Sequence, residues 1–377
     1  MTSTPRVRFD ASLWKLPSQA APPAQPTVAQ PAQAVNFGVQ RWRPASLQHQ
    51  QDGRIHRLSG QTMGTHWSLR LANPDYLPMA PVQVLLQQVF DDVIAQMSNW
   101  EADSVISRFN RSEPGQALVL PAECAHVLEA ALHWAELSGA AMDPSMGGLV
   151  SLWGFGPRQN PLQPHQGQTP AAQDIARLLQ TSGYQHLQWN AQTRQLRQPG
   201  GLELDFCGIA KGFAVDWAVH KLKAAGWAAG LLEVGGELRS WGQRPDERPW
   251  QVQLGTGAVT KTARDSEPLV VATKDGAFAT SGDFWHQFRL DGRRYSHTLD
   301  PRTGWPVAHD LASVTVFHAE CMHADALATV LTVLGPDEGM DFARQHAIAA
   351  VLSSHSDEVV ADRRVLKTPA WINQFGA

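Results

Sequence analysis

The stretch FATSGDFWHQFRLDGRRYSHTLDPRTG, residues 278–304, decides how we expect the C-terminal half of the chain to fold. Its middle alternates on both sides of Asp291-Gly292, and an Asp-Gly pair between two β-prone runs is a strong hairpin signal. We therefore predict an antiparallel hairpin. Polar side chains at its two ends are expected to face each other across the strands: Thr280, Ser281 and Asp283 on one side, and Ser296, His297 and Asp300 on the other.

The polar ends of this hairpin have two interpretations. Hydroxyls, carboxylates and a histidine brought together suit proton transfer and contact with phosphate. The same residue types also satisfy backbone groups in turns, which would give the hairpin a purely structural role. This stretch alone leaves both interpretations open.

The composition predicts a globular protein with a large core. Of 377 residues, 43% are hydrophobic, which is enough to bury a sizeable interior. The net charge of -4 and the lack of a Lys/Arg cluster argue against nucleic acid or an anionic membrane as the main partner. Cys124, Cys207 and Cys321 are odd in number and widely spaced, so we expect neither a disulfide framework nor a zinc site and interpret all three as core residues.

The sequence predicts a disordered segment followed by one folded domain. Residues 1–53 include a Pro/Ala/Gln-rich run that is too poor in large apolar groups to offset chain entropy, so we expect the fold to occupy 54–377. No run of 18 apolar residues exists, and we find neither a signal sequence nor a lipidation cysteine near the start, so the expected location is cytoplasmic. A periplasmic or membrane-associated location is the alternative if the start codon is misplaced.

Hydrophobic periodicity places helices and strands along the domain. Expected helices are 81–97, 122–138, 170–183, 213–225 and 322–334. Expected strands flank 63–65 and lie at 187–189, 194–197, 202–206, 231–239 with a bulge or bend at its two glycines, 250–254, 268–273 and 311–318, with 104–110 and 141–157 as loops. Because consecutive strands connect through hairpins, we predict an α+β fold whose sheet is mainly antiparallel or mixed and packed with helices on one side.

The segment Gly208-Ile-Ala-Lys211-Gly212 follows a predicted strand and leads into a helix. The first N–H groups of a helix are unpaired and its dipole favours negative charge, so a lysine there makes a candidate phosphate site. The spacing of a P-loop is absent, and a tight packing turn between strand and helix explains the same residues.

Asp325 and Thr329 stand four residues apart in the predicted helix 322–334, so their oxygens project from one face. Burying them on an otherwise apolar helix is costly without a partner. A carboxylate and a hydroxyl at this spacing suit Mg²⁺, which accepts few protein ligands. The alternative is an Asp that favours the helix dipole and a Thr that bonds back to its own helix.

Together, these segments resemble the FAD:protein FMN transferases, the ApbE family. The motifs that carry the resemblance occur in the family's order over about 55–365. They are Met63-Gly-Thr65, Met97-Ser98 with Asn110, Asp143-Pro-Ser145 leading to Trp153-Gly-Phe-Gly-Pro157, Asp205 with Gly208-Ile-Ala-Lys-Gly212 and Asp216, Gly235-Gly236, Ala279-Thr-Ser-Gly-Asp283, Ser296-His297 with Asp300-Pro-Arg-Thr-Gly304, and Ala324-Asp-Ala-Leu-Ala-Thr329.

The resemblance implies a fold, an activity and a set of site residues. It implies an ApbE-like, T-fold-like architecture and Mg²⁺-dependent transfer of FMN from FAD to a Thr or Ser hydroxyl of a target flavoprotein, with release of AMP. Implied metal-site residues are Asp325, Thr329, Ala328 and the main-chain carbonyl of Gly208; implied FAD-site residues are Met63, Ala141, Met142, Asp143, Asp205, Lys211 and Leu299. His297 would be the base for the acceptor hydroxyl, with Asp283 orienting it, and histidine's unperturbed pKa suits that task.

Two other functions use the same residues. A Mg²⁺-dependent FAD pyrophosphatase would replace the acceptor hydroxyl with water and give FMN and AMP. A flavin carrier would bind FAD without turnover. The chain also departs from many relatives, which are exported lipoproteins, and its stretch 275–282 superficially resembles an acceptor motif that we interpret as an enzyme strand.

Overall fold

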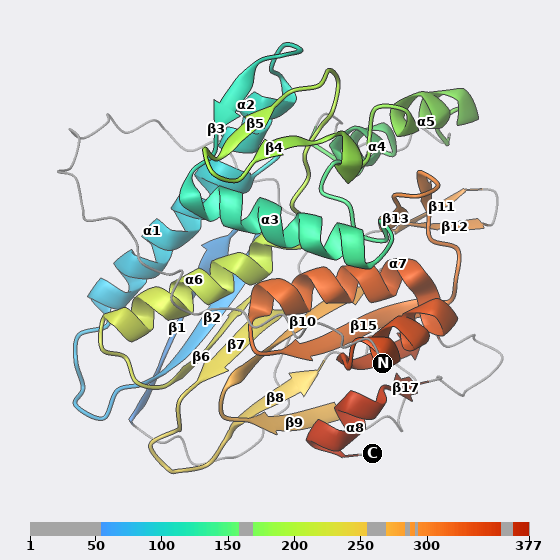
Figure 1. Cartoon of the computed structure of the whole chain (residues 1–377). Helices are drawn as coiled ribbons and strands as arrows, with labels where there is room; N and C mark the ends of the chain where they lie inside the picture. Colours follow the sequence, from blue (N-terminus) through green and yellow to red (C-terminus); the bar gives the residue numbers. More distant parts are fainter. Residues whose placement is uncertain are drawn as a thin grey trace, which may run out of the picture. The chain divides into compact units, whose positions relative to one another are not determined.

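The computed structural model describes residues 54–157, 169–254, 269–282, 287–290, 293–355 and 365–376. Within them, one eight-stranded sheet forms the centre of the fold (Figure 1). Its strands lie in the order β1 (Ile55–Thr62), β2 (Thr65–Ala72), β6 (Gly230–Val234), β7 (Glu237–Trp241), β10 (Gly276–Gly282), β15 (Leu311–His318), β16 (Ala349–Ser354) and β17 (Val365–Lys367). Neighbouring strands of this sheet pair antiparallel, which confirms the predicted α+β class.

Helices and smaller sheets surround the central sheet. The helices are α1 (Ala80–Met97), α2 (Val105–Asn110), α3 (Ala122–Leu137), α4 (Gly147–Leu152), α5 (Ala172–Leu179), α6 (Ala210–Ala224), α7 (Cys321–Gln345) and α8 (Pro369–Phe375), with a 3-10 turn at Tyr184–His186. The other strands are β3 (Ala117–Val119), β4 (Gln188–Asn190), β5 (Gln195–Arg197), β8 (Trp250–Leu254), β9 (Leu269–Thr273), β11 (Gln287–Leu290), β12 (Arg293–Ser296), β13 (Leu299–Asp300) and β14 (Trp305–Pro306). Among the helices in the described ranges, none combines the length and the apolar composition of a membrane span.

The two faces of the central strand β10 show how the sheet is covered. Side chains alternate along a strand, so Ala277 and Ala279 point to one face and Phe278 to the other. The alanines join the apolar clusters built with α6 and α7, whereas Phe278 packs on Trp371 and Phe375 of α8, with ring centroids 6.2 Å and 5.7 Å away. The expectation that helices cover one side is therefore incomplete, because α8 and the β8–β9 hairpin pack on the second face.

The hairpin at 278–304 is shorter than predicted. Strands β11 and β12 pair with Leu290 opposite Arg293, which agrees with a two-residue turn at 291–292, although the turn itself lies outside the described residues. Thr280 and Ser281 do not face Ser296, His297 or Asp300, so that expectation is wrong. They belong to β10, which pairs with β15 in the main sheet, while Asp300 belongs to the separate β13–β14 pair.

Side-chain hydrogen bonds explain two further differences from prediction. Residues 104–110 form helix α2 instead of a loop, because the Ser104 hydroxyl accepts the Ser107 N–H and caps it. Residues 202–206 do not form a ladder strand, because the Asn110 side chain bonds both the N–H and the carbonyl of Leu204 at 2.7 Å and 2.9 Å. Met146 and Glu203 form only an isolated bridge there.

Other differences concern glycines and one cysteine. Residues 147–152 are helical within the predicted loop 141–157, and Gly147 leaves room for Glu203, whose Cβ would lie 2.9 Å from an added Cβ. The expected bent strand 231–239 is two strands, since Gly235 and Gly236 both adopt positive φ in a tight turn. Cys124 and Cys321 are buried as expected, but Cys207 is exposed.

Helices α6 and α7 each carry a carboxylate that accepts N–H groups from the N-terminal end of the other helix. Asp216 of α6 accepts the N–H groups of Cys321 and Met322, the first residues of α7, at 2.9 Å and 2.8 Å. In return, Asp325 of α7 accepts the N–H of Gly212, in the first turn of α6, at 3.0 Å. Each helix thus supplies the carboxylate that satisfies the other helix's unpaired N–H groups.

We expect Asp216→Asn to destabilise the fold by about 2 to 4 kcal/mol. The substitution weakens the cap on α7 and removes the negative charge that pairs with Arg239 of β7. Denaturant unfolding measures the loss, with Asp341→Asn as the control because the Asp341–Arg344 pair is exposed. Equal effects of the two substitutions would contradict the capping role.

Candidate functional site

The crossing of α6 and α7 brings together residues that are far apart in sequence. At Gly212 an added Cβ would lie 2.4 Å from the Cys321 carbonyl oxygen and 2.8 Å from Asp325 Cβ, so only glycine allows this approach. Helix α6 begins at Ala210, three residues earlier than predicted, which places Lys211 in its first turn. The helix N-terminus therefore faces a protein carboxylate, Asp325, where the sequence suggested a phosphate.

Thr329 lies one helical turn after Asp325 and faces the chain segment at Gly208, just before α6. An added Cβ at Gly208 would lie 2.8 Å from Thr329 Oγ1, and the Ser281 hydroxyl of β10 lies 3.4 Å from that same atom. Back-bonding to the helix is seen instead at Thr332, whose hydroxyl donates to the Ala328 carbonyl at 2.7 Å. Asp325 and Thr329 thus share one face, as predicted, and that face is turned toward residue 208 and β10.

Lys211 lies between two buried carboxylates. Its ammonium is 2.7 Å from Glu237 Oε1 and 3.9 Å from Asp325 Oδ1. Burial alone would lower the pKa of Lys211, but the charges of Asp325 and Glu237 outweigh burial and raise it, so the amine stays protonated. Burial raises the pKa of both acids, that of Glu237 to about 7, while Lys211 opposes the rise.

The donors at this crossing suit a small divalent cation. Asp325 is 3% exposed, one of its oxygens is held by the Gly212 N–H, and the other faces the cluster. The Thr329 hydroxyl supplies a second hard oxygen, and the absence of a Cβ at Gly208 keeps the space beside it open. Ala328 contributes no side-chain oxygen, since its methyl is buried in the apolar cluster of β10, β15 and α7. Oxygen donors with few protein ligands match Mg²⁺.

Hydrogen bonds connect the loop around Asp143 to the residues that precede Gly208. Asp143 is buried, and its carboxylate accepts the Ser145 N–H, the Ser145 hydroxyl and the Tyr184 N–H. Burial raises the pKa of Asp143, and these hydrogen bonds oppose the rise. Asp205 donates its N–H to the Pro144 carbonyl and accepts the Cys207 N–H, so it links this loop to the residues before Gly208.

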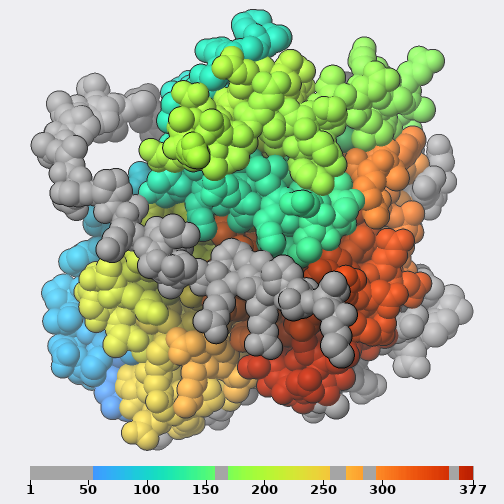
Figure 2. All heavy atoms as spheres, viewed as in Figure 1, coloured from blue at the N-terminus to red at the C-terminus, as the bar shows by residue number. Residues whose placement is uncertain are grey.

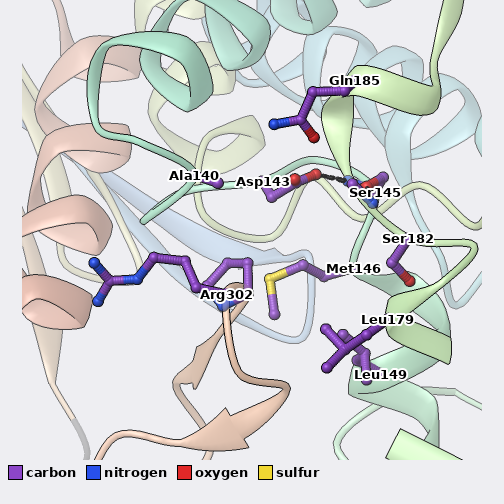
Figure 3. A pocket seen from close by; sticks show the side chains of 11 residues that line it. Ala140, Asp143, Ser145, Met146, Leu149, Leu179, Ser182, Gln185 and Arg302 are labelled. Carbon is purple, nitrogen blue, oxygen red and sulfur yellow. Dashed lines mark hydrogen bonds between the residues drawn. The ribbon is translucent and has the colours of Figure 1, made fainter. Parts of the chain in front are cut away.

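A cavity of about 260 Å³ opens beside Asp143 (Figure 3). Figure 3 shows Met146 between Arg302 on one side and Leu149 and Leu179 on the other. The full lining is Ala140, Asp143, Ser145, Met146, Leu149, Leu179, Ser182, Gly183, Gln185, Pro301 and Arg302. In the space-filling view, α3 forms a band between residues 169–200 and helices α6 and α7 (Figure 2).

The remaining predicted site residues lie on several elements. Met63 has a φ of 48° in the turn between β1 and β2, and Ala141 and Met142 are buried in the largest apolar cluster. Leu299 is buried beside Trp153. The His297 ring packs edge-on against Phe155, with centroids 6.2 Å apart, and Asp283 lies outside the described residues.

Sequence reasoning missed Glu237. It is buried at the start of β7, directly after the Gly235-Gly236 turn, and forms the shortest described contact of the Lys211 ammonium. The available signal was a carboxylate directly after Gly235-Gly236 in a segment predicted to be a strand, since burial of such a charge is costly unless it is paired.

Comparisons with known proteins agree on one family. The sequence profile of the ApbE family matches residues 63–352. A Vibrio cholerae protein named FAD:protein FMN transferase is 33% identical over 308 residues, covering 81% of this chain and 89% of its own length. A Haemophilus influenzae protein of the same name is 30% identical over 314 residues, which cover 82% of this chain and 89% of that protein. The apo crystal structure of Pseudomonas stutzeri flavinyl transferase ApbE superposes with a TM-score of 0.76 at 32% identity, covering 86% of this chain and 97% of that one.

We expect Gly208→Ala to destabilise the fold by about 1 to 3 kcal/mol, because the new methyl group collides with the Thr329 side chain. In a Thr329→Ala background the nearest remaining atom of that side chain is Cβ, at 3.5 Å, so there the same substitution should cost less than about 0.5 kcal/mol. Denaturant unfolding of the original chain, the two single variants and the double variant measures both free-energy changes. The same penalty in both backgrounds would show that residue 208 does not contact Thr329.

Proposed function

Because the chain belongs to the ApbE family, we propose that it is an FAD:protein FMN transferase. It would transfer the FMN half of FAD to a Thr or Ser hydroxyl of an acceptor flavoprotein and release AMP. The observation that carries this proposal is the cluster of Asp325, Thr329, Gly208 and Lys211 at the crossing of α6 and α7.

The reaction replaces the phosphoanhydride bond between the two halves of FAD with a phosphoester bond to the acceptor oxygen. The acceptor oxygen attacks the phosphorus of the FMN half, a new P–O bond forms, and the pyrophosphate P–O bond breaks. AMP leaves with the bonding electron pair, and the hydroxyl proton goes to a base. Such a step depends mainly on positioning and on neutralising phosphate charge.

The residues at the crossing suit that task. Asp325, Thr329 and the Gly208 carbonyl would hold Mg²⁺, which supplies charge neutralisation to the pyrophosphate oxygens when it is bound. The Lys211 ammonium stays protonated beside them and offers a further positive charge to the phosphates. We assign His297 the role of the base for the acceptor hydroxyl. The role of Asp283 as its orienting carboxylate rests on the family resemblance.

The FAD-binding residues extend from the crossing toward Asp143. The Asp205–Pro144 hydrogen bond holds the Asp143 loop against the chain that leads into Gly208. The cavity of about 260 Å³ at Asp143 is smaller than most sites for whole ligands, so it would receive only part of the dinucleotide. Met63, Ala141, Met142 and Leu299 complete the proposed FAD site.

Incubation with FAD, Mg²⁺ and a Thr-containing acceptor protein tests the function, read by flavin fluorescence on the acceptor band in a denaturing gel and by AMP release. We expect both signals, and we expect Asp325→Ala to lose both by at least about a hundredfold. Asp341→Asn, at an exposed ion pair, should retain them. AMP and FMN without a labelled acceptor would favour the pyrophosphatase, and bound FAD without AMP would favour the carrier.

His297→Ala should separate binding from chemistry. We expect FAD affinity within about threefold of the original and transfer slower by roughly a hundredfold or more, because a general base contributes about that much. Titration of FAD fluorescence gives the first quantity and single-turnover labelling of the acceptor gives the second. A parallel loss of affinity and transfer would remove His297 from the role of base.

A further inference from the structure

Glu237 forms an ion pair that the proposed reaction does not explain. It is 2% exposed, and its Oε1 lies 2.7 Å from the Lys211 ammonium. Its other oxygen, Oε2, is buried without a hydrogen-bond partner among the described residues. Burying a carboxylate with one unpaired oxygen costs free energy of folding. If Glu237 served stability alone, an apolar residue in place of its ion pair would serve as well or better.

The position of the ammonium matters because Lys211 and a cation would compete for Asp325. One carboxylate oxygen of Asp325 is occupied by the Gly212 N–H, and the other, Oδ1, faces Lys211. At 3.9 Å, the ammonium is outside hydrogen-bond distance of Oδ1, whereas its distance to Glu237 is that of a direct ion pair. A lysine bonded directly to Oδ1 would have to be displaced before a cation could use that oxygen.

We propose that Glu237 is a positioning residue that holds the Lys211 ammonium away from Asp325 and so keeps this carboxylate open to a divalent cation. The inference rests on the cation site of the proposed function. Glu237 thereby raises the affinity of the site for the cation, while Lys211 stays near enough to meet the phosphates.

The backbone around Glu237 fits this role. Gly235 and Gly236 form the tight turn between β6 and β7, and Glu237 pairs with Val234 as the first residue of β7. This register fixes where the side chain starts, and from there the glutamate carboxylate reaches the Lys211 ammonium at 2.7 Å. An aspartate at the same position would keep the negative charge but withdraw it by one methylene group.

Two variants of the full chain test the proposal, Glu237→Gln and Glu237→Asp, each made alone and in combination with Lys211→Met. Calorimetric titration with Mg²⁺ in the absence of FAD gives the Kd directly. We expect both Glu237 variants to weaken Mg²⁺ binding by roughly tenfold or more, because the released ammonium then pairs with Asp325. Adding Lys211→Met to either variant should restore the Kd to within about threefold of the original, since the competing cation is gone.

The aspartate variant separates positioning from simple charge. If Glu237→Gln weakens Mg²⁺ binding but Glu237→Asp does not, the carboxylate acts only through its charge and the proposal is overturned. Unchanged Kd values for both variants also overturn it. Melting curves without Mg²⁺ establish that each variant is folded, and the aspartate variant carries the test if the glutamine variant folds poorly.

Asp325→Ala distinguishes this inference from the function on which it rests. If Mg²⁺ binds the original chain and Asp325→Ala equally well, or binds neither, the proposed cation site fails. If Asp325→Ala abolishes binding while the Glu237 variants bind as the original does, the cation site stands and only the role of Glu237 is lost.

Discussion

The exchange of carboxylates between α6 and α7 is the interaction on which the site depends. Asp216 caps α7 and Asp325 caps α6, so the two helix N-termini are held against each other by charge-assisted hydrogen bonds in the protein interior. The approach is so close that residue 212 has no room for a side chain. Rotation or sliding of either helix would leave buried N–H groups and carboxylates unpaired, which makes this one arrangement strongly preferred.

Once the helices cross in this way, the positions of the other groups follow. Thr329 is one turn beyond Asp325 and therefore lies over Gly208, while Lys211 is adjacent to Gly212 and therefore lies beside Asp325. The sheet contributes Glu237 from β7 and Ser281 from β10 to the same region. The groups in this region thus come from four segments, namely α7, α6 with the turn before it, β7 and β10, and all of them depend on the same helix crossing.

Periodicity and local spacing predicted much of this fold. An apolar repeat predicts the helix at 81–97, and its members are buried in the structure: Val82, Leu86, Val89, Phe90, Val93 and Met97. The i, i+4 spacing predicts that Asp325 and Thr329 share one face, and the structure confirms it. The error at 202–206 arose because a distant side chain, Asn110, takes the place of a backbone partner at Leu204. The error at 280–281 arose because β10 pairs with β15 in the main sheet. Glu237 could not be identified from spacing, because its partner Lys211 belongs to another element and only the fold brings them together.

The oxygen atoms at the crossing of α6 and α7 are proposed to hold a divalent cation beside the pyrophosphate of FAD. Anomalous diffraction from a crystal grown with FAD and Mn²⁺ in place of Mg²⁺ tests it most directly. We expect a manganese peak between Asp325, Thr329 and the carbonyl of residue 208, with flavin pyrophosphate oxygens completing the coordination. A peak elsewhere, or bound FAD whose pyrophosphate is remote from Asp325, would contradict it.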